Sequence, residues 1–196
     1  MDIIEQYLSE IETAVQRLSR QDIRSVVAVL ESVWERQATT YIIGNGGSAA
    51  TASHMMNDLC KFTRIEGQKP FRAIALTDNV PLMTAVGNDI SFDDIFIHPL
   101  ENVLRPGDVL VAISGSGNSR NIIRACEYAL ENMATVIGFC GSPGGMLAKL
   151  ANHRIIFPAD RIGQQEDGHL ILNHVVALAL RERIQARNSH QALLQA

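Results

Sequence analysis

Apolar positions at the start of the chain recur with the spacing of one helical face. The spacing runs through residues 3–18 and again through residues 21–36, with charged residues between the apolar ones. We therefore expect two amphipathic helices that form a helical hairpin ahead of the rest of the chain. The first helix has little of its own chain to cover it, so burial against a second subunit is favoured over packing on its own sheet.

Beyond residue 38, short apolar or β-branched runs alternate with helical patterns. Near-continuous apolar runs are typical of parallel strands that are covered on both faces. The expected strands are residues 40–44, 71–76, 109–113, 135–140 and 153–157, and the expected helices are residues 49–62, 80–86, 93–104, 120–132, 145–150 and 167–187. The pattern predicts an α/β fold with a doubly wound, mostly parallel five-stranded sheet over residues 38–188, followed by a polar tail, residues 189–196, that frays.

Two glycine-rich turns each follow an expected strand and precede an expected helix. The first is Gly44-Asn45-Gly46-Gly47-Ser48, with Ser48 as the expected helix cap, and the second is the serine and glycine alternation of residues 114–119. Unpaired N–H groups at such helix starts attract an anion. An ordinary βα turn explains the first loop alone equally well. Because carboxyl ends of parallel strands share one edge, two such loops favour a phosphorylated ligand held there.

Composition and charge exclude several classes of protein. The chain has 196 residues, a formal charge of -4 and no long basic run, so nucleic acid is a poor candidate ligand. Cys60, Cys126 and Cys140 lack metal-binding spacing and are expected to be reduced, packed thiols. No apolar run approaches the ~18 residues of a membrane span, and the first residues are acidic, so we expect a cytoplasmic protein without membrane partners.

Nucleotide-binding motifs are incomplete. The turn after Gly44 lacks the full G-x-G-x-x-G spacing, and Asp78 is only a loose candidate for the acidic residue that a dinucleotide fold places after its second strand. No Gly-Lys-Ser/Thr sequence is present, which excludes a Walker loop. The glycine-rich turns therefore favour a ligand other than a dinucleotide or a nucleoside triphosphate.

The two turns, with residues 86–89, 106–110, 144–146 and 168–170, resemble the SIS (sugar isomerase) family of phosphosugar-binding domains, and within it the phosphoheptose isomerases. The resemblance implies the SIS fold, a homotetramer with sites at subunit interfaces, and aldose-ketose isomerisation of sedoheptulose 7-phosphate or a related heptose phosphate through an enediol. It also implies substrate-binding residues, with serines on the phosphate and the first loop around the sugar: Asn45, Gly46, Gly47, Ser48, Asp89, Ser114, Gly115, Ser116, Ser119 and Glu166. Gly115 stands where the family usually has threonine.

The resemblance further implies one zinc ion per site, held by His54, Asp58, Glu166 and His174, with Asp58 and His174 as the proton-transfer residues. Asp58 replaces the usual glutamate and Glu166 the usual glutamine, so activity stays an open question. His54 and Asp58 are four residues apart, which places them on one helical face; an ordinary solvated pair has the same spacing. Glu166 and His174 would lie ~12 Å apart along a helix, so the site is expected to combine elements from more than one place.

Two other functions fit the same fold. One is a non-catalytic phosphosugar-binding and protein-interaction protein similar to the DnaA initiator-associating relatives; Asp58 and His174 favour catalysis over it. The other is a phosphosugar-sensing regulator, although no DNA-binding module is attached. Among the remaining histidines, His169 is expected on a helix surface, with a supporting role at the site as the alternative, and His98 and His153 are expected to be structural. Asp160 and Arg161 are placed at the pocket rim.

Overall fold

The centre of the molecule is a parallel sheet. A computed structural model describes the backbone of residues 2–195 and the side chains of residues 2–187. Its five strands, all parallel, are β1 (Thr40–Gly44), β2 (Ala73–Ala75), β3 (Val109–Ser114), β4 (Thr135–Gly141) and β5 (His153–Phe157). The strand order is β2-β1-β3-β4-β5, so the chain winds outward in both directions from β1 and β3. The doubly wound fold predicted from the sequence is confirmed.

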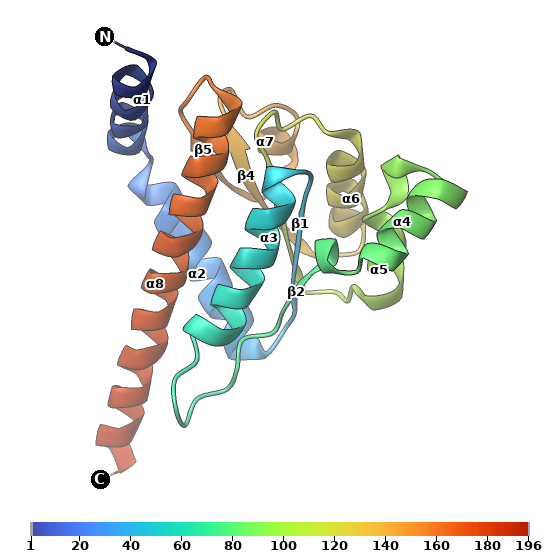
Figure 1. Cartoon of the computed structure of the whole chain (residues 1–196). Coiled ribbons are helices and arrows are strands. Elements are labelled where there is room, and N and C mark those ends of the chain that lie inside the picture. Colours follow the sequence, from blue (N-terminus) through green and yellow to red (C-terminus); the bar gives the residue numbers. More distant parts are fainter. Residues whose placement is uncertain (1, 196) are drawn as a thin grey trace.

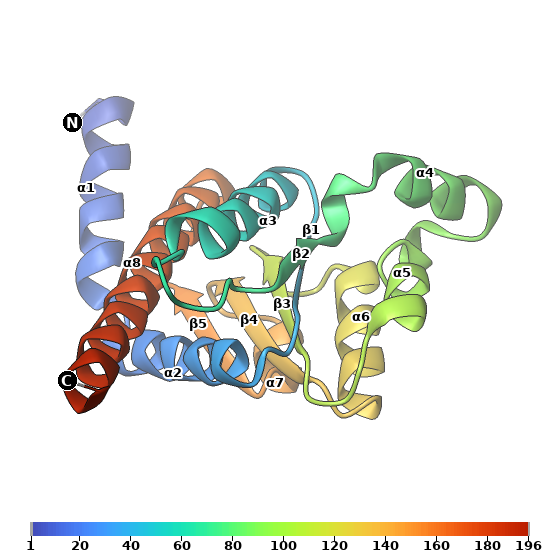
Figure 2. The same cartoon turned by 90° about the horizontal axis from the view of Figure 1, so that it is seen from below.

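Helices cover both faces of this sheet, as Figure 2 shows. One face carries α2 (Arg20–Arg36), α3 (Gly47–Asn57) and α8 (Ile162–Gln195), and the other carries α5 (Ile97–Val103), α6 (Arg120–Glu131) and α7 (Leu147–Leu150). Side chains alternate along each strand: Ile42 packs in the first core and Ile43 in the second. Burial on both faces explains why the strands are almost uninterrupted apolar runs.

Three expected elements differ in length from their sequence patterns. The second strand is only Ala73–Ala75, because a 3₁₀ turn, Leu76–Asp78, takes over before α4 (Val80–Asp89). The helix expected over residues 93–104 is a 3₁₀ turn, Phe92–Asp94, followed by α5, since the Ser91 hydroxyl caps the turn by accepting from the Asp93 N–H. Helix α8 begins at Ile162 rather than at residue 167. Its first turn is polar and contains Gly163, so the sequence pattern did not indicate a helix there.

Helix α8 extends into the expected polar tail, residues 189–196. The helix continues through to Gln195, whereas the side chains of residues 188–196 lie outside the described part of the structure. Over the part of the chain that the structure describes, none of the helices is both long and apolar enough to cross a bilayer.

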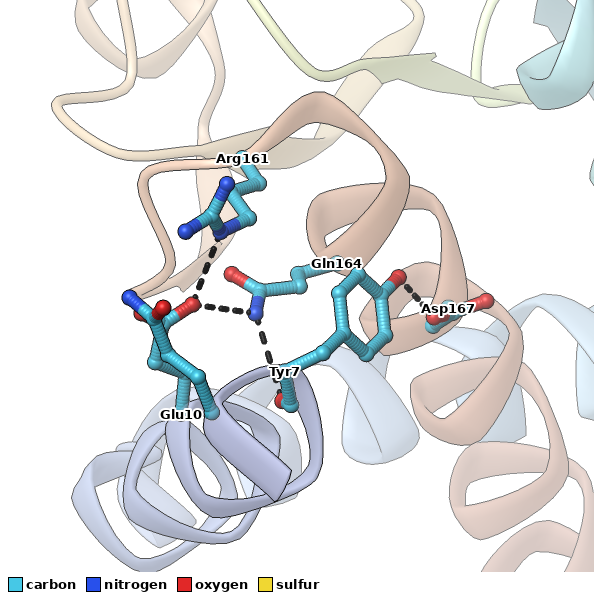
Figure 3. Close-up of polar contacts among 6 residues, drawn as sticks. Tyr7, Glu10, Arg161, Gln164 and Asp167 are labelled. Carbon is cyan, nitrogen blue, oxygen red and sulfur yellow. Dashed lines mark hydrogen bonds and ion pairs between the residues drawn. The ribbon is translucent and has the colours of Figure 1, made fainter. Parts of the chain in front are cut away.

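The two N-terminal helices are present, and they differ in how they are covered. Helix α2 packs on the sheet, while α1 (Ile3–Arg17) projects beyond it beside the start of α8 (Figure 1). Figure 3 shows its attachment: the Tyr7 hydroxyl donates to Asp167, and Glu10 accepts from Arg161 and Gln164. These hydrogen bonds lower the pKa of Glu10 to about 2, with that of Arg161 the largest cause.

The opposite face of α1 is apolar and bare. Ile3, Ile4 and Leu8 are exposed, and they line a shallow surface hollow together with Tyr7. Contiguous exposed apolar side chains of this size mark interaction surfaces.

Candidate functional site

The two glycine-rich loops meet at the carboxyl edge of the sheet. Gly44 at the end of β1 is paired with Ile113 of β3, so the loops that follow these strands start side by side. Between them is a cavity of about 130 Å³, which the start of α8 also lines. Seven of the residues expected to bind substrate line it: Asn45, Ser48, Ser114, Gly115, Ser116, Ser119 and Glu166.

The first loop enters its helix earlier than expected. The N-cap of α3 is Gly46, not Ser48, and it makes no side-chain cap. Gly46 has a φ of 53°, a conformation that glycine adopts without strain, and this turn lets the helix begin at Gly47. The first turn of α3 is therefore left without a cap from Gly46 at the edge of the cavity, and the carboxylate of Glu166 lies over it.

The second loop presents hydroxyl groups. The Ser114 hydroxyl accepts from the Gly117 N–H at 3.1 Å, and the Ser116 hydroxyl accepts from the Asn118 N–H at 3.2 Å. Each O–H remains able to donate to a ligand, since a hydroxyl can accept and donate at once. Gly117 is required here: its φ is 64°, and an added Cβ would lie 2.1 Å from the Gly144 carbonyl oxygen.

An asparagine that the sequence does not single out joins the two loops. Asn121, in the first turn of α6, is buried and exchanges two amide hydrogen bonds with Asn45, both at 2.9 Å. The pair fixes the first loop against the helix that follows the second. Its partner residues are 76 positions apart in the chain, so no local pattern could have found it.

A second group of functional side chains lies farther along α3 and α8. The two helices lie side by side and start at the same edge of the sheet (Figures 1 and 2). Nε2 of His54 lies 3.0 Å from Nε2 of His174 and 3.4 Å from Oδ2 of Asp58, and the His174 nitrogen lies 3.9 Å from the same oxygen. The histidine side chains are 43% and 55% exposed, so the group opens to solvent.

The carboxylate of Asp58 accepts a hydrogen bond on its buried side. It is buried, and its Oδ2 accepts a 2.9 Å hydrogen bond from Nδ2 of Asn173, which the sequence analysis did not single out. Asp58 also begins a π-helical turn, Asp58–Phe62, in which the Thr63 N–H donates to the Asp58 carbonyl. Such turns inside helices are frequent at functional sites, because the extra residue redirects the side chains around it.

Glu166 is not part of this group. Among the described residues, the cluster whose ligand atoms lie within 4.8 Å of one another is His54, Asp58 and His174. The Glu166 carboxylate instead lies over the start of α3, where a Cβ on Gly47 would be 2.5 Å from its oxygens. The cause is the straight course of α8, since eight residues of helix separate Glu166 from His174 by ~12 Å.

Comparison with known proteins shows which family the chain belongs to. The chain matches the SIS domain family over residues 5–141, and it is 34% identical to the phosphoheptose isomerase of Aquifex aeolicus over 92% of this chain and 94% of that protein. The chain belongs to the phosphoheptose isomerase family. The phosphoheptose isomerase of Geotalea daltonii is 36% identical over 88% of this chain and 89% of its own length. The structure of phosphoheptose isomerase GmhA from Neisseria gonorrhoeae is similar with a TM-score of 0.83, covering 91% of this chain and 95% of that one at 27% identity.

The donor set of this member of the phosphoheptose isomerase family fits a divalent metal ion. Two imidazole nitrogens and one carboxylate oxygen are the ligands of many catalytic zinc sites, which keep a further position open. A tetrahedral zinc ion with usual bond lengths needs its nitrogen ligands about 3.3 Å apart, close to the separation of the two Nε2 atoms. The structure identifies a group that could hold a metal, with Asp58 as its carboxylate.

One histidine expected on the surface is buried, so that prediction is wrong. His169 is fully buried on the sheet-facing side of α8, against the ring of Phe139. Burial is the main cause and lowers its pKa, while the Cys140 backbone acts in the opposite direction. Neither ring nitrogen has a partner among the described residues. The polar run of residues 164–167 just before His169 hid the inward face of the helix.

Other sequence candidates lie away from the cavity. Asp89 ends α4, is exposed and accepts from the Asn88 amide, and it is not among the residues that line the cavity. Arg161 points to Glu10 of α1, as Figure 3 shows, rather than to the cavity between the two glycine-rich loops. His153 is structural, bonded to Ser25 at 2.7 Å. Burial raises the pKa values of Cys126 and Cys140 to about 12, so these two thiols are packed and unreactive.

Proposed function

We propose that this protein is a metal-dependent phosphosugar isomerase that interconverts the ketose and aldose forms of a heptose phosphate, with sedoheptulose 7-phosphate as the ketose. The observation that carries the proposal is the pairing of two sites along the same two helices. The cavity of hydroxyls lies at the start of α3 and α8, and the His54, Asp58 and His174 group lies about two turns farther along. An open-chain sugar phosphate is long enough to reach from one to the other.

The cavity would bind the phosphate and the adjoining hydroxyls of the sugar. Ser114, Ser116 and Ser119 donate to the phosphate, together with amides at the start of α6. Asn45, Gly46, Gly47 and Ser48 border the sugar, and Glu166 accepts from its hydroxyls, which a carboxylate can do from two of them at once. Gly115 leaves room, since a Cβ there would lie 2.7 Å from the Gln165 side chain. Asp89 would act only if another copy of the chain brought it near.

The reaction needs one proton moved between neighbouring carbons and another between their oxygens. Asp58 removes the proton from C1 of the ketose while His174 supplies a proton to O2, which gives the enediol. Asp58 then returns its proton to C2 as His174 takes the O1 proton, which gives the aldose, so no proton is gained or lost overall. His174 would do this through the ring nitrogen that does not bind the ion. A divalent ion held by His54, Asp58 and His174, for which zinc is our choice, would polarise the carbonyl oxygen as a Lewis acid.

The test is turnover of sedoheptulose 7-phosphate by metal-stripped protein, with and without added zinc, alongside metal analysis of the protein as purified. Zinc-dependent turnover is the expected result. If the protein binds the phosphosugar tightly but does not turn it over at any metal concentration, the isomerase proposal is wrong, and a binding protein similar to the DnaA initiator-associating relatives becomes the better description.

We also propose that the protein works in the cytoplasm as a homotetramer, assembled through the helices of residues 1–37. The support is the bare apolar face of α1 and an apolar hollow beside the site that Phe62, Ala177 and Leu178 line together with Asp58 and His174. A second subunit would cover both. Sedimentation of wild-type protein should give a tetramer, and an Ile4→Asp, Leu8→Asp double variant should dissociate; a wild-type monomer would contradict this.

A further inference from the structure

The structure points to a residue that orients the carboxylate of the metal group, the name we give to His54, Asp58 and His174. Asn173 and His174 are consecutive on α8, and both reach Asp58 from different sides. His174 does so from the solvent side, whereas Asn173 is fully buried between α8 and α3. Two consecutive residues of α8 therefore approach the same carboxylate: His174 as a candidate metal ligand beside it, and Asn173 as its hydrogen-bond donor.

The contact is specific to one oxygen. Nδ2 of Asn173 donates to Oδ2 of Asp58, and Oδ2 is also the atom that faces Nε2 of His54 and of His174. The Asn57 amide approaches the other oxygen, Oδ1, at 3.4 Å. The Asn173 hydrogen bond thus sets the rotation of the carboxylate that directs Oδ2 toward the histidines.

Burying this amide has a cost that packing alone does not explain. Oδ1 of Asn173 is buried and has no hydrogen-bond partner among the described residues. A buried carbonyl without a donor is unfavourable, and a leucine of similar volume would avoid that cost. What the amide supplies and leucine does not is the N–H donated to Asp58.

We propose that Asn173 is a positioning residue: it holds Asp58 in the orientation in which Oδ2, with the two Nε2 atoms, can bind one divalent ion. Outer partners of metal ligands fix ligand orientation, and losing one typically weakens metal binding about 10–100-fold. This inference rests on the metal site of the proposed function. Asn173 touches neither the substrate nor the ion.

Metal affinity, measured without turnover, tests the proposal. Zinc affinity is measured by competition with a chelator, and site geometry by the absorption spectrum of bound Co²⁺, for wild type, Asn173→Leu and Asn173→Ala. Leucine fills the volume and alanine leaves a cavity, so a loss that both share belongs to the missing donor. We expect the zinc dissociation constant to rise about 10–100-fold in both variants, with an altered Co²⁺ spectrum.

The matched control is Leu180→Ala, which removes buried packing from the same helix away from the metal group. It should lose stability and keep wild-type zinc affinity. Unchanged zinc affinity in folded Asn173 variants would overturn the proposal, as would an equal loss in Leu180→Ala. If neither Asn173 variant folds, the wild-type NMR signal of the Asn173 side-chain amide decides: it should shift when zinc is added, and an unmoved signal contradicts the proposal.

The result separates this inference from the function on which it rests. Wild-type protein that binds neither zinc nor Co²⁺ refutes the metal site itself. Wild-type protein that binds metal, together with variants that bind it equally well, refutes only the role of Asn173.

Discussion

The two parts of the site are built in different ways. One part, the cavity at the carboxyl edge of the sheet, is formed mainly by two loops, each a short continuous stretch that links a strand to the helix after it. The other part, the group that could hold a metal, consists of His54 and His174, which are 120 positions apart, and of Asp58, whose Oδ2 faces both. In the cavity, backbone geometry and small side chains determine the chemistry, whereas in the metal group the packing of α3 against α8 does.

This difference in construction predicts how each part of the site should respond to a substitution. A cavity with several neutral donors shares its binding energy among many hydrogen bonds, so loss of one is partial. The metal group has only three candidate ligands among the described residues, so we expect the loss of any one to weaken metal binding strongly. The largest effects are therefore expected in the metal group, and the effects in the cavity should be smaller and confined to substrate binding.

Asp58→Asn should give the largest loss. The amide keeps the shape of the side chain but cannot accept a proton, so kcat should fall by about 10³-fold, within the range for a general base. Asp58→Glu, which restores the residue usual in the family, should retain far more activity. Glu131→Gln, which changes an exposed acid at the C-terminal end of α6, is the control and should be unchanged. Asp58→Asn at wild-type rate would show that the metal group is not catalytic.

Ser116→Ala should affect substrate binding and leave metal binding alone. Loss of one hydrogen bond to a charged phosphate corresponds to about a 10-fold to 100-fold rise in KM. Ser25→Ala serves as the control, because that hydroxyl bonds to His153 away from the cavity. A fall in zinc affinity with Ser116→Ala would mean that the two parts of the site are coupled more closely than their positions suggest.

Glu166→Gln tests where the boundary between the two parts lies. Because the Glu166 carboxylate lies over the start of α3, zinc affinity should stay within about threefold of wild type while KM for the phosphosugar changes. His54→Ala, measured in parallel, should lose zinc binding. A loss of zinc affinity in Glu166→Gln as large as in His54→Ala would instead make Glu166 a fourth ligand in the assembled enzyme.

His169 gives the smallest expected effect, seen in stability. Its pKa in the folded protein is lowered by burial, so the unfolded chain binds a proton more readily as the pH falls below about 6.5. The free energy of unfolding should therefore decrease between pH 7.5 and pH 5.5, and urea denaturation at the two values measures it. His169→Gln should reduce that decrease; an identical pH dependence would show that His169 is charged or accessible in the folded state.

Local sequence predicted much of this protein. The runs around Ile43 and Val111 are apolar without interruption because parallel strands are buried on both faces, so the sheet could be predicted. The two glycine-rich loops could be predicted as well, since a strand, a turn and a helix start are neighbours in the chain. Resemblance to the family added His54, Asp58 and His174, which periodicity alone would not have brought together.

Tertiary structure decided the rest. The straight helix α8 separated Glu166 from His174, and its packing against α3 buried Asn173 behind Asp58. Packing of α8 on the sheet, against Phe139, turned His169 inward, although the polar residues 164–167 before it suggested a surface position. Sequence periodicity reports which side of a helix is apolar on average, but a single polar side chain takes its role from the element packed opposite it. That partner is set by the fold: Asp58 lies 115 positions from Asn173 in the chain, and Phe139 lies 30 positions from His169.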